Sequence, residues 1–112
     1  MPFANNFERD LHFAKHGHKF GAASADEYER MADHFMYGPL DQDTRECTRP
    51  VGPKGKQDKL RFGFVTHYQA VACIMPAFVR TFHPVELRFI AKRGGEAGYF
   101  AYQCGRMAGV DL

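Results

Sequence analysis

The sequence predicts an α+β fold in which two N-terminal helices pack on a twisted antiparallel sheet of four to five strands. Apolar residues recur at helical spacing in the first third of the chain and alternate with polar residues in the second half. Helices first and a strand meander afterwards are typical of α+β rather than of a βαβ fold. The 112 residues, 45% of them apolar, are enough for one core, so we expect a single domain over residues 1–112.

The first helix is expected to begin after Asn5 and to end at His16-Gly17. The Asn5 side chain can accept a hydrogen bond from the first turn, in which Glu8 lies. Gly17 is expected to end the helix in the left-handed conformation that glycine adopts without a steric penalty. Its apolar stripe consists of Phe7, Leu11 and Ala14.

The second helix is expected to begin at a capping box and to end at Gly38-Pro39. Ser24 and Glu27 have the spacing of that box, in which the side chain of each residue accepts a hydrogen bond from the backbone N–H of the other. The apolar stripe that follows at helical spacing consists of Tyr28, Met31, Ala32, Phe35 and Met36.

The Pro- and Gly-containing stretch 40–59 predicts a loop, with 52–59 as its mobile part. Alternating or continuously apolar segments then predict five strands, at 60–65, 70–75, 78–83, 85–91 and 99–102. Gly94-Gly95 is expected to form the hairpin turn before the last of them.

Several classes of protein are excluded or disfavoured by composition. No uninterrupted apolar run approaches the length of a membrane span, and the N-terminus lacks the basic and apolar regions of a signal peptide, so a cytoplasmic location is expected. Three cysteines are an odd number without paired spacing, which argues against a disulfide framework and against a cysteine-based zinc site.

Charge is segregated along the chain although the net charge is only +2. Residues 24–46 contain seven acidic and two basic side chains, whereas residues 47–62 contain five basic side chains and one acidic. One acidic and one basic face would suit a protein that meets a polyanion on one side. Two ordinary solvated faces explain the pattern equally well.

The densest cluster of titratable groups lies at the end of the first helix and contains His12, Lys15, His16, His18 and Lys19. Three interpretations compete: a metal site at His12 and His16, surface histidines favoured by the helix dipole, and a site facing phosphate. Arg80-Thr81, followed by His83, is a second candidate, because burying an arginine requires an anionic or hydrogen-bonding partner. An exposed arginine on an edge strand is the alternative.

Alternation along a strand would point Arg80 and Thr81 to opposite faces of the sheet. Both can reach one ligand only if a bulge or a bend re-aims one of them, so we expect a distortion between Phe78 and Pro84.

Two motifs connect these residues with a known family. The Lys-His-Gly-x-x-Phe-Gly segment that starts at Lys15, the capped helix with Glu27-Tyr28 and the strand from Arg80 to Pro84 resemble ribonuclease toxin domains. These are the barnase, EndoU, colicin and RelE superfamily, found at the C-termini of bacterial polymorphic toxins. The resemblance covers roughly residues 8–102. It departs from the family at Thr81, because the family's Thr-Tyr-Phe-x-Pro strand is here one residue shorter. A second departure is that the sequence begins with its own Met, without a delivery module.

The resemblance implies a metal-independent endoribonuclease without a cofactor, in which the RNA 2′-hydroxyl attacks the adjacent phosphorus. His16 would be the general base or acid, with His83 or His12 as the complementary proton carrier. Arg80 would stabilise charge on the phosphorane, Thr81 would bind a phosphate oxygen, and Tyr99 or Tyr102 would support them. The residues implied to contact the RNA backbone are Lys15, Lys19 and Arg61.

The implied partners are RNA, with transfer RNA among the candidate targets, and an acidic immunity or inhibitor protein. The alternative function is a non-catalytic, for instance phage-encoded, binding protein that uses the same scaffold to dock on a host protein or nucleoprotein complex. Its acidic helix around Asp26 to Asp33 would meet a basic partner. A metal-dependent hydrolase is a third possibility. The oligomeric state is left open by the sequence.

Overall fold

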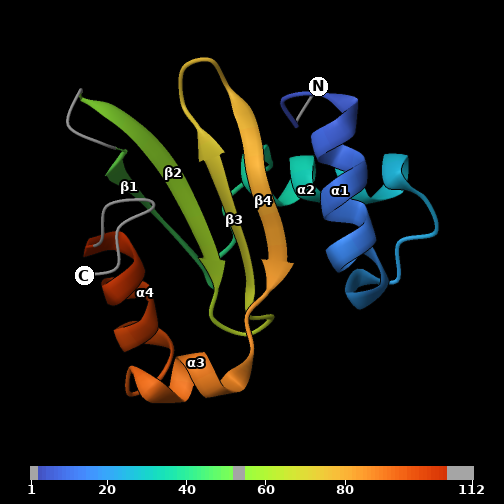
Figure 1. Ribbon diagram of the computed structural model, residues 1–112. Coiled ribbons are helices and arrows are strands. Elements are labelled where there is room, and N and C mark those ends of the chain that lie inside the picture. The colour runs from blue at the N-terminus through green and yellow to red at the C-terminus, as the bar shows by residue number, and fades with distance from the viewer. Residues whose placement is uncertain (1–2, 52–54, 106–112) are drawn as a thin grey trace.

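The computed structural model describes residues 3–51 and 55–105 and has the α+β architecture predicted from the sequence (Figure 1). Four antiparallel strands form one sheet in the order β1-β2-β3-β4, which is a meander. Their bounds are Thr44–Val51 for β1, Lys56–Gly63 for β2, Tyr68–Cys73 for β3 and Phe78–Pro84 for β4.

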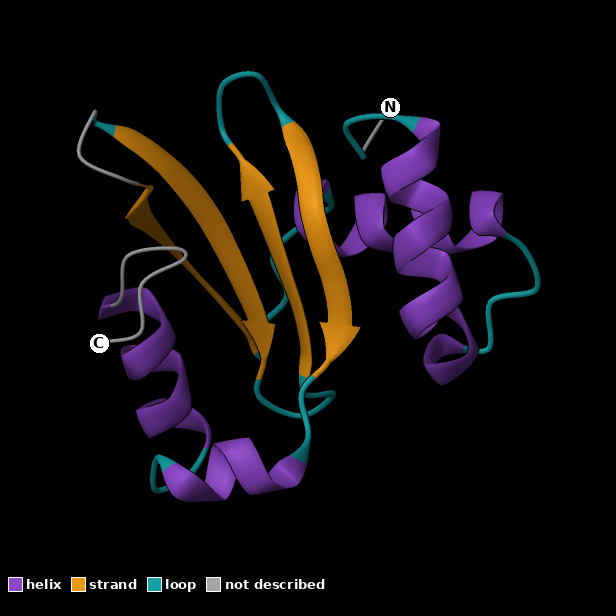
Figure 2. Ribbon diagram, viewed as in Figure 1, coloured by secondary structure: helices purple, strands orange, loops and turns teal. Residues whose placement is uncertain are grey.

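Helices cover both faces of this sheet (Figure 2). The first pair is α1 (Asn6–His16) and α2 (Ala25–Tyr37), joined by the short 3-10 helix η1 (Gly17–Phe20). The second pair, α3 (Leu87–Lys92) and α4 (Glu96–Gly105), follows the last strand. None of the helices in the described ranges is long and apolar enough to cross a membrane.

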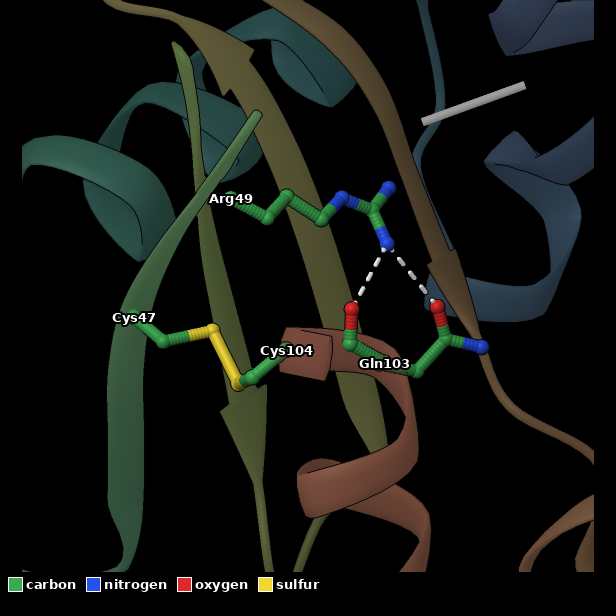
Figure 3. Close-up of a disulfide and its surroundings, with 4 residues drawn as sticks. All are labelled: Cys47, Arg49, Gln103 and Cys104. Carbon is green, nitrogen blue, oxygen red and sulfur yellow. Dashed lines mark hydrogen bonds between the residues drawn. A yellow bond between two sulfur atoms is a disulfide. The ribbon is translucent and has the colours of Figure 1, made fainter. Parts of the chain in front are cut away.

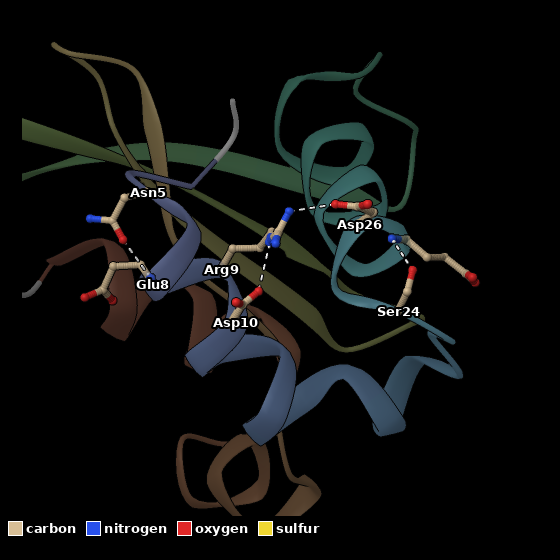
Figure 4. A network of polar contacts seen from close by, with 7 residues as sticks. Asn5, Glu8, Arg9, Asp10, Ser24 and Asp26 are labelled. Carbon is tan, nitrogen blue, oxygen red and sulfur yellow. Dashed lines mark hydrogen bonds and ion pairs between the residues drawn. The ribbon is translucent and has the colours of Figure 1, made fainter.

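Side-chain caps begin α1 and α2 as predicted (Figure 4). The Asn5 Oδ1 accepts from the Glu8 backbone N–H at 2.8 Å, and the Ser24 Oγ accepts from the Glu27 N–H at 3.1 Å. The Arg9 guanidinium then joins the two helices by pairing with Asp26 at 2.6 Å. The two capping bonds, from Glu8 N–H to Asn5 and from Glu27 N–H to Ser24, satisfy backbone donors that the first turn of a helix cannot pair internally.

Two expectations for α1 are wrong. Gly17 has φ −55°, so it continues right-handed into η1, and Gly21 with φ 70° is the left-handed glycine that ends this segment. The apolar stripe of Phe7, Leu11 and Ala14, which would be expected to pack on the sheet, is instead exposed, with 73% of Phe7 and 39% of Leu11 accessible. The opposite stripe faces the core: the Phe13 ring lies tilted against Tyr28 at 6.2 Å, and the His12 ring stacks on Phe3 at 5.6 Å.

The core between the first helix pair and the sheet is built on Tyr28, which is fully buried. Its hydroxyl donates to the Phe82 backbone carbonyl, and the Phe82 ring stacks on Phe20 at 4.2 Å between centroids. The other members of this core are Phe3, Ala32, Met36, Ala70, Ala72 and Val79. The predicted stripe of the second helix is therefore confirmed.

A second core lies on the other face of the sheet, under α3 and α4. Its buried members are Leu60, Phe62, Val71, Val85, Ile90 and Tyr99. Leu60 and Phe62 alternate with Arg61, and Val71 alternates with Ala70 and Ala72, so the two cores use opposite faces of the same strands.

Three assignments after residue 40 are wrong. The expected loop contains β1, an edge strand whose polar residues and Pro50 disguise it in the sequence. The strands expected at 85–91 and 99–102 are α3 and α4. Gly94 and Gly95, both with positive φ, form the corner between these helices rather than a hairpin. Of the segment expected to be mobile, 52–54 lies outside the described residues and 56–59 belongs to β2.

A disulfide joins Cys47 of β1 to Cys104 of α4, with a Cα–Cα separation of 6.1 Å (Figure 3). The expectation that no disulfide forms is therefore corrected. The two cysteines are 57 residues apart, and only the packing of α4 across the sheet brings them together. The third cysteine, Cys73, is a buried thiol.

Candidate functional site

A cleft of about 570 Å³ opens on the sheet face that carries α3 and α4. Its floor is formed by side chains of the two last strands, Gln69, Val71, Thr81 and His83. Its walls come from both helix pairs, chiefly His16 and Lys19 on one side and Phe89, Lys92, Tyr99 and Tyr102 on the other. The cleft therefore combines residues from the two ends of the described chain with residues of the sheet.

The floor of the cleft depends on a bulge in β4. Val71 pairs with Thr81 but the next residue, Ala72, pairs with Val79, so Arg80 is an extra residue with no opposite partner. Val79 and Phe82 both face the first core, so the two residues between them, Arg80 and Thr81, both point away from that core. The distortion predicted between Phe78 and Pro84 is confirmed.

Arg80 nevertheless does not line the cleft. Its Nε lies 3.1 Å from Asp58 Oδ1 and 3.0 Å from Asp58 Oδ2, and its guanidinium lies over the Phe78 ring at 5.2 Å. The Asp58 carboxylate is 1% exposed, and a charge so deeply buried needs a cation beside it. The bulge thus supplies Thr81 to the cleft and Arg80 to an ion pair.

His16 and His83 face one another in the cleft, with 5.3 Å between ring centroids. The His83 Nδ1 lies 3.0 Å from the Pro84 carbonyl oxygen. A carbonyl only accepts, so this nitrogen carries the proton and Nε2 of the neutral ring is an acceptor. The His16 Nδ1 is buried without a hydrogen-bond partner among the described residues, so Nε2 is the ring nitrogen left to contact a ligand.

The surroundings of both histidines favour the neutral form of the ring. Burial lowers the pKa of His16 to about 4, and the nearby His83 and Lys19 act in the same direction. Burial also lowers the pKa of His83, against the opposing effect of its bond to the Pro84 carbonyl. An anion placed between the rings would reverse part of this shift, because opposite charge favours the protonated form.

Basic side chains dominate the cleft walls. Lys19, Arg49, Lys92 and Arg93 line it, against Glu86 alone among the acidic residues of the described ranges. The Arg93 guanidinium lies 3.4 Å from the centre of the Tyr102 ring. An excess of cations beside two imidazoles suits a negatively charged ligand.

The disulfide braces one wall of the cleft (Figure 3). Arg49 follows Cys47 by two residues on β1, and its Nη1 donates to the Gln103 backbone carbonyl and to Gln103 Oε1, both at 3.0 Å. Gln103 immediately precedes Cys104 on α4. Covalent and polar contacts therefore hold α4, which supplies Tyr99 and Tyr102, against the edge of the sheet.

Of the residues singled out in the sequence, the structure brings His16, Lys19, Thr81, His83, Tyr99 and Tyr102 into the cleft.

Besides Arg80, four of these residues lie outside the cleft lining: His12, Lys15, His18 and Arg61. His12 stacks on Phe3 at 5.6 Å, and Lys15 is exposed outside the cleft lining. Arg61 is buried on the opposite face, where it pairs with Glu46 at 2.7 Å and donates to two backbone carbonyls at the end of α2. Arg61 is thus not accessible to a ligand in the cleft.

Sequence reasoning missed Gln69, Arg49, Lys92 and Arg93 as cleft residues. Gln69 had one recognisable signal, a polar residue immediately before a continuously apolar strand. The three basic residues had none, because they come from elements assigned to the wrong secondary structure. Among the described residues, no group of three or more metal-ligating side chains is placed to hold an ion.

Comparison of the chain with models of protein families, with curated proteins and with solved structures finds no match.

Proposed function

We propose that this protein is a toxin-like, metal-independent endoribonuclease that cleaves RNA by transesterification. The observation that carries the proposal is the pairing of His16 with His83, 5.3 Å apart, in a cleft rich in cations. Two imidazoles that face one another suit a reaction in which one ring accepts a proton and the other delivers one near neutral pH.

In the proposed reaction, the lone pair on His83 Nε2 accepts the proton of the RNA 2′-hydroxyl. The 2′-oxygen then forms a bond to the adjacent phosphorus, and the bond between phosphorus and the 5′-oxygen breaks. His16, protonated once the phosphodiester anion is bound, delivers its proton from Nε2 to the leaving 5′-oxygen. The products are a 2′,3′-cyclic phosphate and a free 5′-hydroxyl.

The remaining cleft residues would bind the substrate and stabilise the transition state. Lys19 and Arg93 would offset the charge that develops on the phosphorane oxygens, and the Thr81 hydroxyl would donate to one of them. Since Arg80 pairs with Asp58, its proposed part is to keep that buried carboxylate neutralised beside the bulge. The Tyr99 hydroxyl supports the floor of the cleft through Gln69.

The proposal includes a partner and a place of action. A cleft lined by four basic residues would be closed well by an acidic inhibitor protein. Disulfides form in oxidising compartments, so the chain would acquire the Cys47–Cys104 bond on its way to the bacterial cytoplasm in which it meets RNA, including transfer RNA.

The test is incubation of the purified protein with RNA in excess EDTA, followed by identification of the product ends. We expect cyclic phosphate ends, and no cleavage of an otherwise identical oligonucleotide that carries 2′-deoxyribose. His83→Ala and His16→Ala should each lower the rate by roughly 10²–10⁴-fold. His18→Ala is the matched control, since His18 is exposed on η1 and does not line the cleft.

A second candidate, a non-catalytic binding protein, is favoured by one observation: Phe7 and Leu11 form an exposed apolar stripe on α1. If the protein cleaves no RNA while Phe7→Ser abolishes its biological effect, this candidate replaces the ribonuclease. Cleavage that stops in EDTA and returns with zinc would instead support a metal-dependent hydrolase.

A further inference from the structure

Gln69 lines the cleft although its side chain is uncharged, polar and buried. It is 5% exposed and lies on β3 directly opposite His83 on β4. Residues that face one another across antiparallel strands have Cβ atoms roughly 4.5–5.5 Å apart. Both side chains line the cleft, so the Gln69 amide lies beside the ring to which we assign proton abstraction.

A hydrogen bond from Tyr99 fixes which end of this amide is available. The Tyr99 hydroxyl donates to Gln69 Oε1 at 2.7 Å, which occupies the oxygen and leaves the two N–H donors of Nε2. Within residues 3–51 and 55–105, Gln69 has no hydrogen bond from Nε2. Gln69 Nε2 is not one of the side-chain atoms in the described ranges that are both cut off from solvent and unpartnered, so it is open to the cleft, where a ligand can accept from it.

The neighbours of Gln69 indicate the chemistry of that ligand. His83 stands on one side and His16 lies beyond it, while Lys19 and Arg93 supply positive charge to the same cleft. A neutral amide that can only donate, set among cations, is complementary to an oxyanion. Donors aimed in advance at the place where negative charge develops are a principal means of stabilising such a transition state.

We propose that Gln69 contacts the substrate and donates from Nε2 to a non-bridging oxygen of the scissile phosphodiester. Tyr99 is then a positioning residue that holds the amide in its donating orientation. The choice of a phosphodiester rests on the proposed ribonuclease function, but the anion-binding role of Gln69 is measurable without any turnover.

The experiment measures the binding of two probes, a nucleoside 3′-monophosphate and the same nucleoside without phosphate. The variants are Gln69→Met, which keeps the length of the side chain and removes both donors, Tyr99→Phe, and the double variant. Gln57→Met is the matched control, because Gln57 is exposed on β2 and does not line the cleft. Thermal unfolding checks that each variant is folded.

Gln69→Met should weaken binding of the nucleoside 3′-monophosphate by roughly 10–100-fold, the value of one hydrogen bond to a charged group. It should leave binding of the bare nucleoside unchanged, as should the control for both probes. Tyr99→Phe should weaken phosphate binding by less, and it should add nothing when Gln69 is already Met. Such non-additivity is the signature of a residue that acts through another.

The proposal on Gln69 is overturned if Gln69→Met binds the nucleotide as the wild type does, or if the wild type binds neither probe. It is also overturned if both probes lose affinity equally, since Gln69 would then contact the base or sugar. If Gln69→Met does not fold, the double variant replaces it, because removing both partners of a buried hydrogen bond is better tolerated than removing one.

The two proposals fail separately. If the protein cleaves no RNA but Gln69→Met weakens phosphate binding, the anion-binding role of Gln69 stands and the ribonuclease proposal is wrong. If the Gln69→Met variant cleaves RNA at the wild-type rate, the ribonuclease proposal stands and the proposed role of Gln69 is wrong.

Discussion

Removing the disulfide between Cys47 and Cys104 should destabilise the protein and open the cleft at α4. The bond joins residues 57 positions apart in the sequence, so it closes a loop that contains nearly all of the sheet and the whole of α3. Chain entropy gives about 3 kcal/mol for a 15-residue loop and about 4.7 for a 100-residue loop. For this loop we expect the free energy of unfolding to fall by about 4 kcal/mol in the Cys47→Ser/Cys104→Ser variant.

The structure adds a local consequence to this global effect. Among its described residues α4 buries only Tyr99 fully, and beside the disulfide its last turn is held by the hydrogen bonds from Arg49 to Gln103. Without the covalent bond, this short helix is expected to separate from the sheet before the rest of the fold opens. The cleft would then lose the wall that carries Tyr102.

The assay is urea unfolding of the oxidised protein, the reduced protein and the double-serine variant, with hydrogen exchange as the local measure. Reduced wild type and the serine variant should agree, and amides of α4 should lose protection first. Titration of thiols provides an internal check, because only Cys73 should react in the unfolded, oxidised chain. A loss below about 1 kcal/mol, or equal loss of protection throughout the sheet, would refute the reasoning.

Three further predictions concern the helices and the cleft histidines His16 and His83. Ser24→Ala should lower the free energy of unfolding by about 1 kcal/mol in a denaturant titration, because the Glu27 N–H loses its acceptor; an unchanged midpoint would contradict this. Gly98→Ala should cost roughly 1–3 kcal/mol, since the new Cβ would lie 1.9 Å from the Arg93 carbonyl oxygen unless α4 shifts; a melting temperature equal to the wild type would contradict it. The lowered pKa of the cleft histidines means that the unfolded chain binds protons first as pH falls, so stability should decrease from about pH 6.5 towards 4. His16→Asn should reduce this decrease relative to the wild type, and identical pH profiles would show that His16 is not involved.

The sequence predicted correctly those features that depend on neighbouring residues. Asn5 and Ser24 cap their helices because an oxygen two or three residues before a free N–H satisfies it whatever the rest of the chain does. The distortion between Phe78 and Pro84 was predicted so that Arg80 and Thr81 could reach one ligand; the bulge is present, but only Thr81 lines the cleft and Arg80 pairs with Asp58. His16, Thr81 and His83 were candidates on residue type alone, and the structure places all three in one cleft.

Secondary structure beyond Pro84 was decided by packing. Over the six residues of α3, apolar positions satisfy a period of two and a period of 3.6 equally well. Leu60, Phe62 and Val71 form an apolar side of the sheet that would be exposed to water without a cover. The two C-terminal helices supply this cover through Ile90 and Tyr99. Misassigning this segment concealed the basic residues that it brings to the cleft.

The sequence by itself determined the caps, the first helix pair, the central strands and the class of the fold, because each of these is specified by contacts within a few residues. Only the tertiary structure decided which stripe of α1 is buried, that Cys47 reaches Cys104, that Arg80 pairs with Asp58 and that Gln69 lies between Tyr99 and His83. The residue pairs named here are 14 to 57 positions apart in the sequence. Interactions between neighbouring residues do not distinguish one distant partner from another. The choice is made when both faces of the sheet are covered and every buried charge and hydrogen-bonding group must find its counterpart.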